Sequence, residues 1–393
     1  MSRNAVAFDA WIRSSFVEMN TELEELYFAG ADRAKVIGVG DRVKNALEAE
    51  GRAFVKALLV EGNTDEGFDR AFDLLGDLGL YMAALRRHEL TNPDREEKSP
   101  FEEASALGLH IGASVGLAPR FATSHLATHN RAVNGRQKSF TLLKDEVLFL
   151  DCNTRGIFSY MRAADALRRI APLGVSSPAA LTLFDNAGAA LDDVARFNAV
   201  LGERPDVERF FFSVRPYYKP YRVGRTVYRG ANAGDFSGIN EIDLLLGLAR
   251  ANDPYYAQLL VDKMPFMRPE DQASLRDCMR RRSLLDQFLD CLEAARHEPW
   301  FQENARAFLA VCKAHGRTAA QHHDLLVAKF IAEPARRLDE ARLKQVTASG
   351  PPLPVLLKSL EILRDLRLAA KRTDIASSFD KIERLKAAVG SAT

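Results

Sequence analysis

Apolar side chains recur at intervals of three and four residues along most of the chain, and this spacing constrains the fold more than any other feature. It gives a helix one face that packs against a core, because an α-helix completes a turn in 3.6 residues. The spacing is found at 20–30, 41–60, 68–85, 158–170, 179–201, 239–251, 254–264, 269–295, 303–313 and 319–331. A strand pattern is visible only near 225–228. We therefore expect a mainly α fold.

A polar stretch interrupts the helical pattern at 91–100 and contains Pro93 and Pro100. Proline and short polar residues between periodic segments indicate a loop. We therefore predict a small N-terminal helical part, 1–95, and a large helical domain, 96–393. Residues 1–90 match no functional motif, so they are expected to form a helical cap or an association surface, and an oligomer remains open.

Charge and composition exclude several classes of protein. The 54 basic and 53 acidic residues among 393 leave a net charge of +1, which gives no general attraction for nucleic acid or an anionic membrane. No uncharged apolar stretch approaches the ~18 residues of a membrane span, and Asp9 breaks any signal-peptide pattern. Four scattered cysteines indicate neither disulfides nor a zinc ribbon. We expect a cytoplasmic protein that binds neither nucleic acid nor membrane.

Two histidines spaced four residues apart, His125 and His129, would share one face of a helix. That spacing suits a pair of metal ligands, but no third ligand lies at useful spacing. A non-haem metal site and a polar helix face or pocket lining therefore both remain open for this pair.

A second histidine pair lies in an amphipathic stretch near the C-terminus. The positions three, four, seven and eight residues after His323 are all apolar, whereas Lys329 lies seven after His322. His323 is therefore expected to face the interior, as either a hydrogen-bonded core residue or a ligand, with His322 nearer the flank. His315, directly before Gly316, indicates a helix end that the histidine caps.

Aromatic residues surround one arginine at 210–221. Three phenylalanines and three tyrosines lie within twelve residues of sequence around Arg215. Aromatic rings and a guanidinium suit a flat ligand that carries a carboxylate. A helix end packed by aromatic side chains, with the arginine as its cap, explains the same pattern. The stretch 228–238, rich in glycine and alanine, would let backbone approach a ligand or another helix closely.

Taken in chain order, the aromatic stretch, the small-residue stretch and the histidine helix near the C-terminus resemble the indoleamine 2,3-dioxygenase family. They resemble most closely its bacterial branch typified by monodechloroaminopyrrolnitrin synthase. The resemblance spans roughly residues 100–370. The matching residues are His323, Val327, Lys329, Phe330, Ile331 and Pro334-Ala335 in the proximal-histidine helix; Phe210, Phe211, Arg215 and Tyr217 in the aromatic stretch; Asn232-Ala233-Gly234 and 242–247 after it; and Asp151-Cys152 with Gly156-Ile157-Phe158 on the distal side. The order of the clusters is specific, whereas each alone is a weak signal.

The resemblance implies a helical bundle that encloses haem b, with dioxygen as co-substrate. The implied metal ligand is His323, and the other implied cofactor-binding residues are Asn232, Ala233, Gly234, Asp243 and Phe158. The implied catalytic residues are Arg215, which would hold a carboxylate, Phe210 and Phe211, which would stack an indole ring, and Ser349.

The same resemblance implies a haem-dependent oxygenase that acts on the indole ring of tryptophan or a tryptophan-derived substrate in bacterial secondary metabolism. An external electron donor is left open. Oxygenation or rearrangement is favoured over 2,3-cleavage to N-formylkynurenine, because Ala348 stands where the dioxygenases have a loop threonine, leaving Thr347 or Ser349 as replacements. A non-catalytic haem- or ligand-binding helical protein is the main alternative, and a purely structural helical module is another.

Further differences from the dioxygenases surround the implied haem. The family arginine three residues before the proximal histidine is Ala320 here, and Arg317 lies one turn away, so the pairing of Asp243 with an arginine near a haem propionate is left open. The distal serine and cysteine positions are Met161 and Leu126. The distal pocket is therefore expected to differ from that of a dioxygenase.

Overall fold

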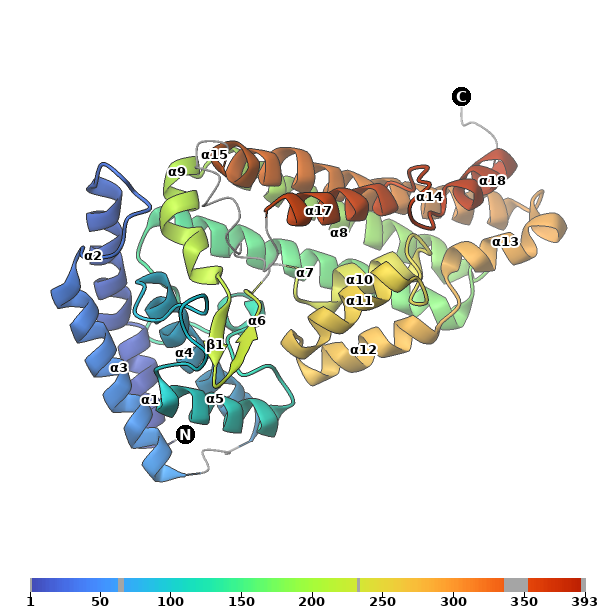
Figure 1. The fold of residues 1–393 in the computed structure, drawn as a ribbon. Helices are drawn as coiled ribbons and strands as arrows, with labels where there is room; N and C mark the ends of the chain where they lie inside the picture. The colour runs from blue at the N-terminus through green and yellow to red at the C-terminus, as the bar shows by residue number, and fades with distance from the viewer. Residues whose placement is uncertain (1, 63–66, 232–233, 336–352, 390–393) are drawn as a thin grey trace. The chain divides into compact units, whose positions relative to one another are not determined.

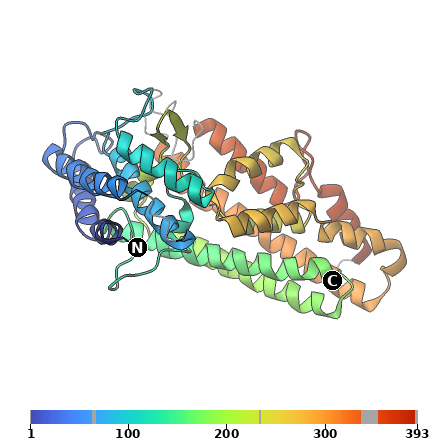
Figure 2. The same cartoon turned by 90° about the horizontal axis from the view of Figure 1, so that it is seen from below.

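The computed structural model describes residues 2–62, 67–231, 234–335 and 353–389. It is 71% helical, and the described residues contain one two-stranded sheet, so the predicted mainly α fold is confirmed. Figure 1 shows the helices in chain order from blue to red, and Figure 2 shows them from below. None of the described helices is both long enough and apolar enough to cross a membrane.

The chain divides into two compact units, each assembled from three segments. Unit 1 contains Met1–Asp151, Pro205–Asp235 and Phe330–Leu356, and unit 2 contains Cys152–Arg204, Phe236–Lys329 and Leu357–Thr393. The boundary near residue 95 stays a prediction.

Unit 1 is built around α4, whose side chains are buried continuously from Leu74 to Arg87. The elements of this unit are α1 (Arg3–Ile12), α2 (Ser15–Ala29), α3 (Asp41–Glu61), α4 (Phe68–Arg87), α5 (Glu102–Val115), α6 (Thr123–Leu126), α9 (Val207–Arg209), η1 (Phe210–Val214), η2 (Arg215–Tyr218), β1 (Tyr221–Val223), β2 (Thr226–Tyr228) and α15 (Glu333–Ala335). An antiparallel hairpin joins β1 to β2 with Val223 opposite Thr226, and Gly224 takes a positive φ of 59° in its two-residue turn.

Unit 2 is a bundle of longer helices. Its elements are α7 (Lys144–Leu173, in this unit from Cys152), α8 (Pro178–Glu203), α10 (Ser237–Leu245), α11 (Pro254–Lys263), η3 (Met264–Phe266), α12 (Pro269–Arg280), α13 (Leu284–Ala295), α14 (Pro299–Gln321), η4 (His322–Ala332, to Lys329), α17 (Leu353–Arg367, from Leu357) and α18 (Phe379–Val389). Side chains from α7, α8, α10, α13 and α14 form one core, and Figure 2 shows α7 and α8 running side by side in green.

Several predicted helix limits are wrong. The single helix expected at 269–295 is two helices, because Ser283 begins a new one by accepting a hydrogen bond from the backbone N–H of Asp286. The two helices expected at 303–313 and 319–331 are one continuous run, α14 followed by η4. His315 is therefore a mid-helix residue and not a cap.

Candidate functional site

Two of the clusters with predicted chemistry, the aromatic stretch and the second histidine pair, begin in π-helical backbone. The aromatic cluster begins in η1 of unit 1, and the histidine pair opens η4, which begins in unit 2. A π-helix is rare, and short π-helical segments occur frequently at functional sites.

Arg215 is a desolvated cation without a counter-ion in the described part of the chain. Its Nη2 is buried and makes no hydrogen bond there, and no carboxylate accounts for its charge. Burial alone lowers the pKa of Arg215 to about 10. Its guanidinium lies 5.5 Å from the ring centre of Phe211. Lys219, four residues later, is also affected, since burial and nearby arginines lower its pKa to about 8. This part of unit 1 is therefore suited to receive an anion.

The neighbouring Arg87 provides a contrast within the same unit. Its Nε and Nη2 donate to the two carboxylate oxygens of Glu24 at 2.7 and 2.8 Å, and Nη2 also donates to the carbonyl of Phe212 at 2.9 Å. Arg87 is thus neutralised in place and holds the backbone of η1. Arg215, in contrast, retains unused donors.

The aromatic residues of 210–221 divide into two groups. Tyr217 stacks on Phe140 with ring centres 4.4 Å apart, and Tyr218 meets the edge of Phe140 at 5.8 Å, so these tyrosines belong to the unit 1 core. Phe210 is half-buried against Phe149, 5.1 Å between ring centres. Phe211 is 8% exposed. The two phenylalanines and the arginine thus lie together at the start of η1 and η2.

Part of the small-residue segment and the loop after η4 lie outside the described residues. Asn232, Ala233 and Ser349 fall there, so their predicted roles stay predictions. Gly234 is described and lies in a turn, and the following Asp235 is buried and accepts two hydrogen bonds from Arg229 at 2.8 and 2.9 Å. This ion pair fixes the end of the segment on unit 1.

His323 has one ring nitrogen engaged and the other available. Its Nδ1 lies 2.8 Å from Oδ1 of Asp324, and Arg364 Nη1 approaches the same nitrogen at 3.3 Å. A carboxylate only accepts hydrogen bonds, so the closer contact puts the proton on Nδ1 and leaves the lone pair on Nε2. Among the described residues Nε2 has no partner, and the side chain is 21% exposed. This arrangement suits a metal ligand.

His322, directly before it, lacks such a partner. No hydrogen bond fixes its ring to any described residue, and burial, Arg367 and His323 lower its pKa to about 4 although much of the residue is solvent-accessible. The surroundings of His322 thus favour its neutral form and leave its ring without a fixed orientation, whereas Asp324 orients the ring of His323.

Asp243 lies in a closed polar network in the core of unit 2. Its carboxylate accepts a bidentate pair from Arg367 at 2.9 Å, a hydrogen bond from Tyr256 Oη at 2.7 Å and a contact from His315 Nε2 at 2.7 Å. Although burial opposes ionisation, the Arg367 charge and the His315 hydrogen bond hold the pKa of Asp243 well below its usual value. Arg317 pairs with the exposed Asp192, so the arginine that pairs with Asp243 is Arg367.

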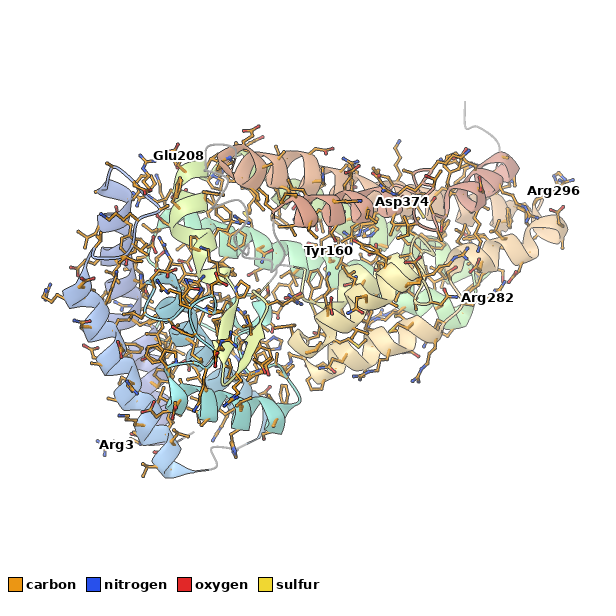
Figure 3. All side chains as sticks on the ribbon, in the orientation of Figure 1. Arg3, Tyr160, Glu208, Arg282, Arg296 and Asp374 are labelled. Carbon is orange, nitrogen blue, oxygen red and sulfur yellow. The ribbon has the colours of Figure 1, made fainter. Side chains whose placement is uncertain are left out.

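Phe158 lies on an accessible face of α7 in unit 2. It is 46% exposed, and Met161, one turn later, is 37% exposed. Two large apolar side chains on one exposed helix face provide an apolar surface for a flat ligand or a partner. Tyr160, which lies between them in sequence and is labelled in Figure 3, packs against the core of unit 2 and donates from Oη to Thr318 Oγ1 at 3.0 Å, which fixes this part of α7 to α14.

The His125 and His129 pair does not form a metal site. His125 is buried, its Nδ1 accepts from the backbone N–H of Ala122 at 2.8 Å, and its Nε2 donates to the carbonyl of Phe72 at 2.8 Å. Both nitrogens are therefore used, and the helix α6 ends before His129. Across the described ranges, no group of three or more His, Cys, Asp or Glu side chains is arranged to hold a metal ion.

A family model described as "Monodechloroaminopyrrolnitrin synthase PrnB" matches residues 2–389. The chain belongs to this family. Its members are haem-dependent oxygenases that act on a tryptophan-derived substrate in secondary metabolism, with dioxygen as the oxidant. The family match extends over the N-terminal residues, in which the sequence offered no recognisable motif.

The side chains of this chain fit a haem. A histidine that binds haem iron does so through an unprotonated ring nitrogen, and it commonly donates its other N–H to a carboxylate, carbonyl or water. Nε2 of His323 is such a nitrogen, and Asp324 is such an acceptor. Sequence reasoning singled out His323 as a candidate ligand but assigned no role to Asp324, Arg364 or Arg367. The two arginines were missed because only the folded chain shows which arginines of α17 reach η4 and α10.

Proposed function

We propose that this PrnB-family protein is a haem b oxygenase that acts on an indole amino acid, with Arg215 as the carboxylate-binding residue and His323 as the axial ligand. The observation that carries this proposal is the buried, unpaired Nη2 of Arg215, whose half-buried side chain has no counter-ion in the described chain. Burying an unpaired cation costs free energy, and a bound carboxylate would offset that cost.

Arg215 would bind the substrate carboxylate through two parallel N–H donors. Such charge-assisted pairs are short and directional, so they would fix the orientation of the amino acid as well as its affinity. Phe210 and Phe211 would contact the indole ring. Phe211 already lies beside the guanidinium, which would place the ring and the carboxylate of one ligand within reach of one short segment.

His323 would hold haem iron through Nε2, and the bound haem would supply activation of dioxygen. The apolar face of Phe158 and Met161 would contact the porphyrin or exclude water from it. Asn232, Ala233 and Gly234 are proposed to bind the cofactor on the resemblance alone. Asp243 would act indirectly, because its oxygens are already taken by residues of unit 2.

The protein's contribution is chiefly position. Arg215, Phe210 and Phe211 would hold the substrate in one orientation, which lowers the entropic cost of its reaction. The substrate ammonium has no assigned partner, since Ala348 replaces the loop threonine and Ser349 is the candidate substitute. This difference favours oxygenation or rearrangement of the indole over simple 2,3-cleavage, and an external electron donor would supply any reducing equivalents that the haem requires.

Labelled dioxygen tests the proposal. The haem-reconstituted protein is supplied with a chemical reductant, ¹⁸O₂ and either L-tryptophan or a ring-substituted tryptophan. Mass spectrometry then measures the number of ¹⁸O atoms in each product. We expect turnover of an indole amino acid that depends on dioxygen. Incorporation of both labelled atoms indicates ring cleavage, whereas one or none indicates oxygenation or rearrangement. Haem binding without any substrate-dependent oxygen consumption would support the non-catalytic haem-binding protein instead.

A further inference from the structure

The carboxylate next to His323 belongs to an ordered chain of alternating charges. Asp324 Oδ1 lies 2.8 Å from Nδ1 of His323 and 3.4 Å from Arg364 Nη1. Arg364 in turn donates from Nε to Asp365 at 3.0 Å, and Asp365 is paired with Arg372. All these residues lie in unit 2.

The far end of this chain is also anchored. Arg372 donates two hydrogen bonds to Asp374, at 2.8 and 2.6 Å, and Asp374 is labelled in Figure 3 beyond the end of α17. Isolated surface ion pairs contribute little to stability, but a network with bidentate members holds its side chains in defined positions. Arg364 is therefore held on two sides, by Asp324 and by Asp365.

This chain has a chemical consequence for the imidazole. A carboxylate that accepts a hydrogen bond from Nδ1–H fixes the ring's tautomer and orientation. It also makes Nε2 donate its electron pair more strongly to a metal ion. The Arg364 guanidinium opposes that effect, since it draws negative charge away from Asp324. The two side chains act on one nitrogen in opposite directions, which makes their individual substitution informative.

We propose that Asp324 is a positioning residue that orients His323 with Nε2 toward the metal and strengthens its donation, and that Arg364 limits this effect. The inference rests on the proposed function, because it needs His323 as the axial ligand. Asp324 touches neither substrate nor haem in this account. It acts through the imidazole alone.

The test is the iron midpoint potential of the reconstituted protein, measured by spectroelectrochemistry, together with the haem dissociation rate. Asp324→Asn keeps a hydrogen-bond acceptor and removes the charge. We expect the ferric form to lose affinity about tenfold relative to the ferrous form, which raises the midpoint by about 59 mV. Haem dissociation is expected to become about tenfold faster, in line with the loss of a partner of a metal ligand. Arg364→Gln should shift the midpoint downward.

A matched control is available on the same helix. Glu361 lies 4.0 Å from Arg364 and makes no contact with His323, so Glu361→Gln removes an equal charge nearby without touching the imidazole. We expect its midpoint to stay at the wild-type value. If surface charge in general set the potential, the midpoint of Glu361→Gln would shift as much as that of Asp324→Asn, and this result would overturn the inference.

The outcomes separate this inference from the proposed function. If His323→Ala loses the axial ligand but Asp324→Asn and Arg364→Gln both keep the wild-type midpoint, the positioning role is wrong and the ligand assignment stands. If His323→Ala keeps the wild-type spectrum, the ligand assignment is wrong and this inference falls with it. Should Asp324→Asn fail to fold, the downward shift in Arg364→Gln decides the question alone.

Discussion

Arg215 has its pKa lowered by burial from 12.5 to about 10, and this shift gives a magnitude for its replacement by methionine. One pKa unit corresponds to about 1.4 kcal/mol, so the charge on Arg215 lowers the free energy of unfolding by at most about 3 kcal/mol. The side chain is only half-buried, so solvent screening reduces this to about 1–2 kcal/mol. Because a base whose pKa is lowered on folding destabilises the fold at every pH below the folded value, Arg215→Met should stabilise the ligand-free protein at pH 7.

Binding should change in the opposite direction. A hydrogen bond to a charged group contributes about 1.5–3 kcal/mol, so loss of the guanidinium should weaken L-tryptophan about 10- to 100-fold. Tryptamine has the same ring and amine but no carboxylate, and its affinity should change less than about twofold. Calorimetric titration of wild type and Arg215→Met with both ligands forms a complete cycle, in which the coupling between arginine and carboxylate is the difference of the two losses.

Arg87→Met is the matched stability control. It leaves the buried Glu24 carboxylate unpaired, so it should destabilise unit 1 by about 3–5 kcal/mol, opposite in sign to Arg215→Met. Urea unfolding followed by circular dichroism measures both. Equal losses of L-tryptophan and tryptamine affinity in Arg215→Met, or no loss for either, would refute the carboxylate clamp. A destabilised ligand-free Arg215→Met would refute the claim that the cation is unpaired.

Three further predictions concern stability. Asp243→Asn should lower the free energy of unfolding in urea by about 3–5 kcal/mol at pH 7. In the wild type, the stability contributed by the ion pair of Asp243 with Arg367 should be lost as the pH falls below about 4, because the pKa of Asp243 is lower in the folded than in the unfolded state. Gly79→Ala should lower stability by about 1–3 kcal/mol, because its Cβ would lie 2.2 Å from the backbone nitrogen of Phe121, whereas Gly188→Ala, with no atom within 4 Å, should gain about 0.5–1 kcal/mol. Burial raises the pKa of Asp77 to about 7, so wild-type stability should fall by up to about 1.4 kcal/mol per pH unit between pH 4 and 7, and Asp77→Asn should flatten that slope.

Helix positions were largely predictable because apolar periodicity reports burial directly. Helix limits were less so. Gly316 was interpreted as a stop, but a Cβ there would lie 3.0 Å from the carbonyl of Arg367, so this glycine permits close packing of α14 against α17. The break before α13 depends on one hydroxyl, that of Ser283, which the apolar pattern does not register. Local spacing cannot distinguish a helix crossing from a helix end.

The candidate site was predictable where its chemistry is local to a segment. Phe211 and Arg215 do contact each other within one short stretch. The partners of Asp243 and His323 were not predictable, because Arg367 and Arg364 come from α17, 124 and 41 residues away in sequence. Burial of charge also depends on the whole fold, so the difference between paired Arg87 and unpaired Arg215 has no signature in the sequence.

The most direct test of the account is the absorption spectrum of haem-reconstituted His323→Gly with and without added imidazole. His322→Ala, the adjacent histidine, is the matched control. We predict that His323→Gly alters or loses the Soret band, that imidazole restores it, and that His322→Ala keeps the wild-type spectrum. A wild-type spectrum in His323→Gly, or loss of the band in His322→Ala alone, would contradict the assignment of His323 as the axial ligand.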